Sequence, residues 1–383
     1  MDTRRHRNVA RFLCVLGMLT TINMVPSAQA TGTQATSTQA TGNFYQQHNL
    51  VSDGANPADN TDPNLINSWG IAFNPFGPVW VADNGTGVST LYDGNGKPQS
   101  LVVQIPSPAN GSGSGTPTGI VFNASTGFVV SQGSASGASK FIFATEDGVI
   151  AAWAPNVDAT HAIRMVDNSV ATGAVYKGLA LSANGDGNLL YAADFHNNRI
   201  DVFDSSFKPV TLPAGAFSDP NLPYGFAPFG LQAIGGDIYV SYAKQDAAKH
   251  DDVAGVGLGF IDVYDPNGTL LKRLVSQGSL NSPWGMALAP AGFGKFSGRL
   301  LVGNFGDGLI HAYDIATGDS AGTLKDAGMR PIQIDGLWGL AFGNGFDKQP
   351  VNTLFFTAGP GDEKQGLYGR IDVAPDAGQD SGP

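Results

Sequence analysis

Polar side chains that could bind a metal ion follow several short apolar segments of this sequence. Carboxylate, amide and imidazole groups are the usual ligands of Ca²⁺ and of catalytic divalent cations. The residues that we predict as metal ligands are Asp83, His196, Asn197 and Asn304. A second interpretation stays open, because Asp and Asn after a strand commonly form turns and a lone histidine is often a surface residue.

A second set of candidate residues directly precedes six regularly spaced glycines. Its members are Trp69, Thr118, Lys177, Phe229, Trp284 and Trp338. Aromatic side chains opposite a single lysine suit a flat or sugar-like ligand that carries an acidic group. The alternative is structural, since an aromatic residue beside a glycine can pack between repeated units. A charged segment at residues 244–252 is either a solvated loop or a lid over such a site.

These candidates belong to a repeat that predicts the fold. The glycines at positions 70, 119, 178, 230, 285 and 339 each open a short apolar strand, and a period near fifty residues with strand-like content is typical of a propeller. Two further strands are expected after each one; in the second unit, the next strand is predicted at residues 128–131. A fourth strand is expected in five units, at residues 101–103, 163–166, 209–212, 271–275 and 321–324.

The sixth unit offers no fourth strand of its own, because Pro, Asp and Gly follow its third strand. We expect residues 44–52 to pair with it, since closing the ring removes an exposed sheet edge. The prediction is an all-β, six-bladed β-propeller spanning residues 43–374. Residues 31–42 and 375–383 are expected to be a disordered linker and a disordered tail, from their composition.

Residues 1–30 have the pattern of a secretory signal peptide, with four arginines, an apolar stretch at 12–19 and a cleavage site near Ala30. We therefore expect a secreted or periplasmic protein without membrane insertion after signal removal. The only cysteine, Cys14, lies in that segment, which excludes thiol chemistry in the mature chain.

The 383 residues carry a net charge of −11, or −14 without residues 1–30. This charge disfavours nucleic acids as partners, and we expect a monomer that binds a small molecule or a protein.

Residues 190–203, which read Leu-Tyr-Ala-Ala-Asp-Phe-His-Asn-Asn-Arg-Ile-Asp-Val-Phe, resemble NHL-repeat propellers. The chain as a whole resembles an uncharacterised family of secreted bacterial six-bladed propellers, some of which end in a PEP-CTERM sorting segment. In related propellers, the connections from strand four to one and from strand two to three form the usual ligand face. The resemblance implies no established activity.

Three functions remain open from the sequence. The first is a ligand-binding module that uses the central mouth of one face. The second is a metal-assisted lactone hydrolase or lyase of the gluconolactonase or streptogramin-lyase type, with a divalent cation such as Ca²⁺ as cofactor. The third is a protein-interaction scaffold, which predicts an apolar patch on the outer rim.

Overall fold

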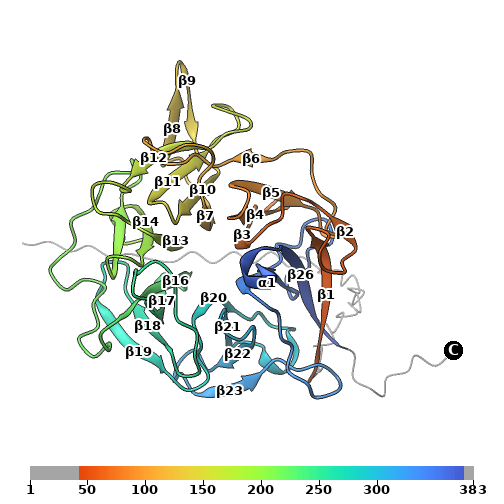
Figure 1. Ribbon diagram of the computed structural model, residues 1–383. Helices are drawn as coiled ribbons and strands as arrows, with labels where there is room; N and C mark the ends of the chain where they lie inside the picture. Colours follow the sequence, from red (N-terminus) through yellow and green to blue (C-terminus); the bar gives the residue numbers. More distant parts are fainter. Residues whose placement is uncertain (1–42, 375–383) are drawn as a thin grey trace, which may run out of the picture. The chain divides into compact units, whose positions relative to one another are not determined.

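The computed structural model describes residues 43–374, so the predicted signal peptide, linker and tail (1–30, 31–42 and 375–383) lie outside the described residues. Six sheets surround a common axis (Figure 1). The innermost strands follow one another in a closed ring, and they are β3 (Ser68–Phe73), β7 (Pro117–Phe122), β13 (Tyr176–Ala183), β16 (Phe226–Ile234), β20 (Pro283–Leu288) and β24 (Leu337–Phe342). The predicted six-bladed β-propeller is confirmed.

Blades 1, 4 and 5 follow the predicted strand order, and blade 3 follows it for its first three strands. Blade 1 continues with β4 (Val79–Asp83), β5 (Val88–Tyr92) and β6 (Val103–Gln104), and blade 3 with β14 (Asn188–Asp194) and β15 (Arg199–Phe203). Blade 4 continues with β17 (Asp237–Lys244), β18 (Gly259–Tyr264) and β19 (Leu270–Ser276). Blade 5 continues with a 3₁₀ turn at Gly294–Phe296, then β21 (Leu300–Asn304), β22 (Ile310–Tyr313) and β23 (Ser320–Thr323). The fourth strand expected at residues 209–212 is absent from blade 3, where Pro209 makes only an isolated bridge to Phe203.

Blade 2 differs from the prediction in its second strand. The segment predicted there forms β8 (Val129–Gln132), which pairs only with β9 (Ala135–Ala138) in a hairpin that projects from the blade (Figure 1). The second strand is instead β10 (Phe141–Thr145), followed by β11 (Val149–Trp153) and β12 (Ile163–Asp167). Both segments are apolar and β-branched or aromatic, so composition alone does not distinguish them. The loop between the second and third strands of blade 2 therefore begins at Glu146.

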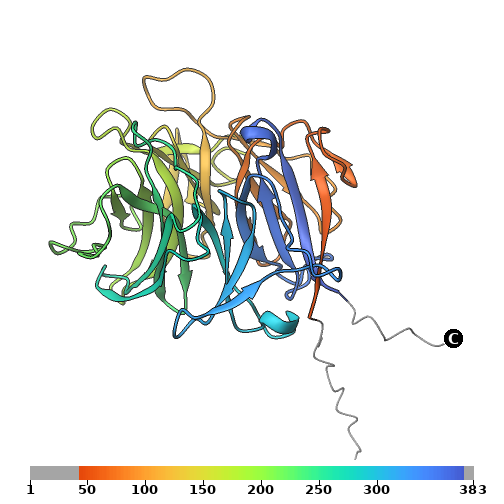
Figure 2. The same ribbon diagram turned by 60° about the horizontal axis from the view of Figure 1, so that its bottom comes forward.

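The ring closes through the N-terminal part of the described chain. Blade 6 contains β25 (Leu354–Ala358) and β26 (Leu367–Val373), and β1 (Tyr45–Ser52) pairs antiparallel with β26. The short β2 (Asn60–Thr61) then pairs with β1. Because Tyr45 lies opposite Val373, both ends of the described chain emerge on one face of the propeller (Figure 2). The expected closure is therefore present.

Apolar side chains fill every junction between neighbouring blades. Six buried clusters each combine residues of two adjacent blades, and a seventh lies where the inner strands converge. Each cluster stabilises a contact between nearest neighbours, as expected of a repeat protein. Among residues 43–374, no helix is long and apolar enough to cross a membrane.

The repeated glycines mark a β-bulge in every inner strand. In blade 6, for example, Leu337 pairs with Ala358 and Leu340 with Phe356, so Trp338 and Gly339 together face Thr357 alone. The same count of two residues against one recurs at the equivalent place in the other five blades. A bulge redirects the side chain at its first position. The glycine repeat therefore turns the residue before each glycine out of the regular alternation of the strand.

Close approach between blades explains why the second bulge position is glycine. A Cβ on Gly339 would lie 2.6 Å from the Trp69 carbonyl oxygen of blade 1, and one on Gly119 would lie 2.7 Å from the Leu179 nitrogen of blade 3. Real Cβ atoms do not approach backbone atoms so closely, and glycine has no Cβ. The six glycines thus allow the inner strands to approach one another around the axis.

Candidate binding site at the polar mouth

The six residues that precede the glycines are all buried, and none is more than 8% exposed. Three of the four aromatic members, Trp69, Trp284 and Trp338, contact one another across the axis with ring centroids 3.4–5.7 Å apart. Phe229 joins them edge-on, with its ring 5.9 Å from that of Trp338. The tryptophans therefore fill the channel where the inner strands converge.

Two phenylalanines from the loops after the second strands complete this aromatic plug. Phe305 stacks on Trp338 with centroids 3.9 Å apart, so Trp338 lies between Phe305 and Trp69. Phe195 packs against Phe229 at 5.2 Å. We call these six residues the aromatic plug: Trp69, Phe195, Phe229, Trp284, Phe305 and Trp338. With its rings packed face against face and edge against face, the plug separates the two ends of the channel.

The other two members of the set make polar contacts. The Thr118 hydroxyl donates to the Tyr176 carbonyl oxygen at 2.8 Å and so joins blades 2 and 3. Lys177 is 1% exposed, and its ammonium lies 5.0 Å from the Trp69 ring centroid. The ammonium also pairs with Glu146, and with Asp251 at 3.3 Å. Two carboxylates therefore already neutralise the charge that the sequence-based prediction assigned to an acidic ligand.

A chain of hydrogen bonds runs from the plug around this end of the axis. Asn67 accepts from the Trp338 indole at 3.1 Å and donates to Glu363 Oε2 at 2.7 Å. It also donates to Asn84 at 3.3 Å, and Asn84 donates to Glu146 Oε2 at 2.7 Å. We call this end the polar mouth; its residues are Asn67, Asn84, Glu146, Lys177, His250, Asp251, Asp252 and Glu363. They come from blades 6, 1, 2, 3 and 4.

Tight turns hold the acidic residues of the polar mouth in place. Glu146 lies in the turn between β10 and β11, where Gly148 has a φ of +84°. His250 and Asp251 lie in the loop after β17, and the Asp251 carbonyl accepts from the Asp246 amide at 2.8 Å. The charged segment that the sequence suggested as a lid is thus ordered over the axis by its own hydrogen bonds.

Glu363 ends a left-handed turn, α1 (Pro360–Glu363), in which Gly361, Asp362 and Glu363 have φ values of +66°, +54° and +62°. Non-glycine residues rarely adopt this conformation, and such strain concentrates at functional sites. The Asn67 side chain holds the Glu363 carboxylate toward the mouth.

The charges of the polar mouth act on one another. Burial alone would lower the pKa of Lys177, but Glu146 and Asp251 more than offset it, so the pKa is raised and the ammonium stays charged. The hydrogen bond from His250, 2.8 Å away, and the nearby Lys177 lower the pKa of Asp251 to about 2. The same bond raises the pKa of His250.

Two further carboxyls bring the mouth to an excess of negative charge. Burial raises the pKa of Glu363 and of Asp252, although Asn67 partly offsets the effect at Glu363. Glu146, Asp251, Asp252 and Glu363 together face a single lysine and one histidine. Because acidic groups outnumber basic ones, the mouth favours a cation over an anion.

The four predicted metal ligands lie apart from this mouth network. Asp83 is fully buried, accepts from Ser68 and Thr90 at 2.8 and 2.7 Å, and has a pKa raised by burial. Asn197 donates to Asp194 at 2.7 Å, and Asn304 to the Ser279 carbonyl at 2.8 Å. His196 follows the plug residue Phe195 in the loop after β14. Their assignment as metal ligands stays a prediction.

Within residues 43–374, the group of acidic and imidazole side chains that could share a metal ion is Glu146, His250 and Asp251. One potential ligand atom from each lies within 4.8 Å of the others. His250 and Asp251 lie in the charged segment at residues 244–252 that the sequence indicated, but Glu146 was missed because the second strand of blade 2 was misplaced. Identifying residues 141–145 as that strand would have found it, since Glu146 follows directly.

Comparison with known proteins identifies the class of fold. Virginiamycin B lyase from Staphylococcus aureus superposes with a TM-score of 0.50 at 12% identity, covering 86% of this chain and 99% of that one. A Bacteroides thetaiotaomicron protein of unknown function also gives 0.50, at 11% identity over 86% of this chain and 76% of that one. The chain has the six-bladed fold of the NHL and streptogramin-lyase type, and such low identity shows the fold alone.

Sequence relatives identify the family. The chain is 36% identical over 329 residues to uncharacterized protein R648 of Acanthamoeba polyphaga mimivirus, covering 84% of this chain and 78% of that protein. It is 32% identical over 366 residues to uncharacterized protein L690 of the same virus, covering 94% and 92%. The chain belongs to the family of these proteins. No family model matches, and the viral source of the relatives gives no support to the expected bacterial family.

Proposed function

We propose that this protein is a ligand-binding propeller whose polar mouth recruits a divalent cation through Glu146, His250 and Asp251. The observation that carries the proposal is their convergence: one potential ligand atom from each lies within 4.8 Å of the others, above the aromatic plug. Atoms this close can share one cation at the 2.0–2.6 Å distances usual for divalent ions. The proposed cation site uses other residues than the predicted metal ligands, and it replaces the acidic ligand predicted beside Lys177 with a cation.

The donor set favours a transition metal over Ca²⁺. Two carboxylates and one imidazole suit Zn²⁺ or Mn²⁺, whereas Ca²⁺ prefers oxygen ligands alone. The Lys177 ammonium already pairs with the carboxylates of Glu146 and Asp251, so an incoming metal ion competes with it. Because the polar mouth has more carboxylates than basic groups, its negative charge can balance a metal ion in addition to the ammonium. A bound ion would then offer open coordination positions to a ligand that enters the mouth.

Cation binding is expected in calorimetric titrations of the metal-free chain with MnCl₂, ZnCl₂ and CaCl₂. We predict one site, tighter for Mn²⁺ and Zn²⁺ than for Ca²⁺. Glu146→Gln and Asp251→Asn should each weaken it at least about tenfold, because each removes a charged ligand. Asp186→Asn removes an exposed carboxylate at the far end of blade 3 and is the matched control. Equal affinities for the control and both mouth variants would contradict the proposal, as would no binding of any ion.

Acid should weaken this binding, because the cation competes with the proton on His250. The pKa of His250 is raised above its ordinary value of 6.5, so the imidazole is protonated at mildly acidic pH. Below the raised pKa, the association constant should fall about tenfold per pH unit, and above it the constant should level off. Asp251, with a pKa of about 2, stays ionised throughout a titration from pH 5.5 to 8.5. An affinity that does not vary over this range would exclude His250 as a ligand.

A metal-assisted lyase or hydrolase is the second candidate, and Glu363 favours it. Its carboxyl has a pKa raised by burial, which suits a general base or acid, and it is held by Asn67 in a strained turn beside the cation group. Virginiamycin B lyase shows that this fold can carry a lyase. Ring opening of cyclic esters that stops with EDTA, and stops in Glu363→Gln without loss of cation binding, would support it. Turnover unchanged by Glu363→Gln would exclude it.

A further inference from the structure

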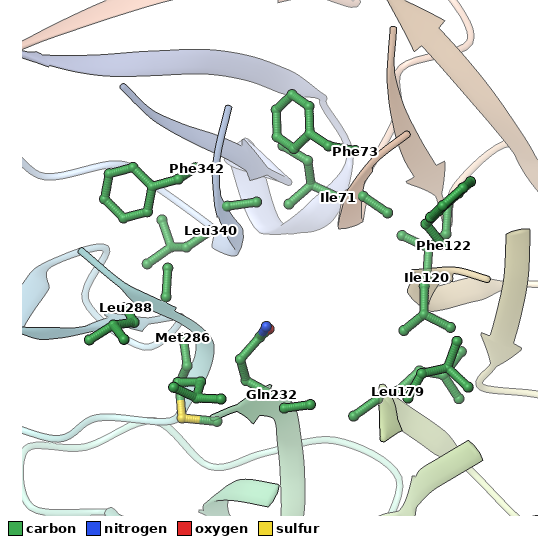
Figure 3. A pocket seen from close by; sticks show the side chains of 18 of the residues that line it. Ile71, Phe73, Ile120, Phe122, Leu179, Gln232, Met286, Leu288, Leu340 and Phe342 are labelled. Carbon is green, nitrogen blue, oxygen red and sulfur yellow. The ribbon is translucent and has the colours of Figure 1, made fainter. Parts of the chain in front are cut away.

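The opposite end of the channel is a funnel whose lining side chains are mainly apolar, separate from the polar mouth. Its cavity of about 600 Å³ is lined by the residues that follow the six glycines in the inner strands (Figure 3). Large apolar side chains of its wall include Phe73, Phe122, Met286 and Leu288. A smaller cavity of about 50 Å³ lies at the level of the glycines and reaches the plug residue Trp284. The aromatic plug lies beyond it.

One polar side chain interrupts this apolar wall. Figure 3 shows the Gln232 amide directed into the cavity, where the neighbouring labelled side chains are hydrocarbon or thioether. The equivalent position, second after the glycine, is Ala or Val in the other five blades: Ala72, Val121, Ala180, Ala287 and Ala341. Gln232 is exposed to solvent at the wall of the funnel, and among the described hydrogen bonds none involves its side chain, so its donor and acceptor are both accessible to a ligand in the cavity.

We propose that the funnel binds a small molecule with an aliphatic body and one amide-like polar group that pairs with Gln232. A cavity of about 600 Å³ lies within the usual 300–1,000 Å³ of small-molecule sites, which are mostly apolar with a few polar groups that fix orientation. An alkyl chain that covers the apolar side chains of the funnel removes their surface from water, which favours binding. A primary amide offers one donor and one acceptor, which match those of a glutamine side chain.

Separation by the plug makes this site independent of the cation proposal. The residues of the polar mouth precede the glycines along the inner strands or lie in the loops at that end, whereas the lining of the funnel follows the glycines. The aromatic plug lies between the two sets. If no cation binds at the polar mouth, the funnel can still bind an amide. If no amide binds in the funnel, the polar mouth can still bind a cation.

The test is calorimetric titration of the full chain with hexanamide, heptanamide, octanamide and nonanamide. Each added methylene should tighten binding about fourfold, as burial of apolar surface predicts. Gln232→Ala gives blade 4 the residue found at the equivalent position in four of the other five blades, so the substitution should preserve the fold. In this variant, each added methylene should still tighten binding about fourfold. The affinity for every amide should fall by the same factor of about five, because only the hydrogen bonds to Gln232 are lost.

Two further variants test the location. Ala341→Phe fills the funnel, and Leu288→Lys introduces a charge at a wall position where the leucine is 40% exposed. Each variant should lower the affinity for octanamide at least tenfold. Val170→Thr removes an apolar side chain that is 76% exposed in a loop at the other face and should leave binding unchanged. No binding by any amide would overturn the proposal. So would a series that responds equally to Val170→Thr and Leu288→Lys, or one whose affinities Gln232→Ala leaves unaltered.

Discussion

Gly339→Ala is expected to lower the free energy of unfolding by about 3 kcal/mol, a large effect for one methyl group. The new Cβ would lie 2.6 Å from both the Trp69 carbonyl oxygen and the Thr357 hydroxyl. Thr357 donates to that carbonyl at 2.5 Å and accepts from the Gly339 amide at 2.9 Å, so the methyl group enters the contact that joins blades 6 and 1. A closed ring cannot widen at one junction without strain at the others. Urea unfolding followed by tryptophan fluorescence measures the loss.

Gly187→Ala is the control for this prediction. Gly187 precedes β14 without a positive φ, and a Cβ there would meet no atom within 4 Å. The substitution should leave the free energy of unfolding within about 0.5 kcal/mol of the parent value, as for other open surface sites. Equal effects of the two substitutions would mean that the repeated glycines serve chain flexibility and not close approach between blades.

Trp338→Ala should destabilise the protein by about 3–5 kcal/mol, the usual range for removing a buried tryptophan. Trp338 is 1% exposed and is stacked between Trp69 and Phe305, so its removal opens a cavity at the centre of the plug. It also leaves Asn67 without the indole donor at 3.1 Å and thereby loosens the contact to Glu363. Chemical unfolding gives the free energy, and near-ultraviolet circular dichroism reports the loss of the stacked indoles.

Trp338→Phe separates packing from hydrogen bonding at the same position. Phenylalanine keeps an aromatic ring between Trp69 and Phe305 but cannot donate to Asn67. A loss of about 1–3 kcal/mol is expected, set by the unpaired Asn67 oxygen and the smaller ring. If both variants unfolded at the parent midpoint, the plug would contribute nothing to stability, contrary to its burial.

The sequence predicted the architecture well because the glycine bulge has a local physical cause. Each blade needs a residue without a Cβ at the same junction, so the requirement repeats along the chain and can be read from spacing. Closure by residues 44–52 followed from the missing fourth strand of the last blade. The hairpin of β8 and β9 was misassigned because an inserted strand has the same alternation as a blade strand.

The site was less predictable, since its residues meet only in the folded ring. Lys177 was identified beside the aromatic residues, but its partners Glu146 and Asp251 come from blades 2 and 4. No local pattern relates a turn at residue 146 to a loop at residue 251. The sequence analysis therefore predicted an acidic ligand beside Lys177 and a metal site at other residues, because the two carboxylates that pair with Lys177 could not be read from spacing.

The measurement that tests the cation proposal most directly is anomalous scattering from crystals of the chain grown with MnCl₂. A manganese peak is expected within about 2.6 Å of oxygen or nitrogen atoms of Glu146, His250 and Asp251, above the aromatic plug. At the same MnCl₂ concentration, a weaker peak is expected in crystals of Asp251→Asn. Manganese bound elsewhere with none at the polar mouth, or a peak of equal height in Asp251→Asn, would contradict the cation proposal.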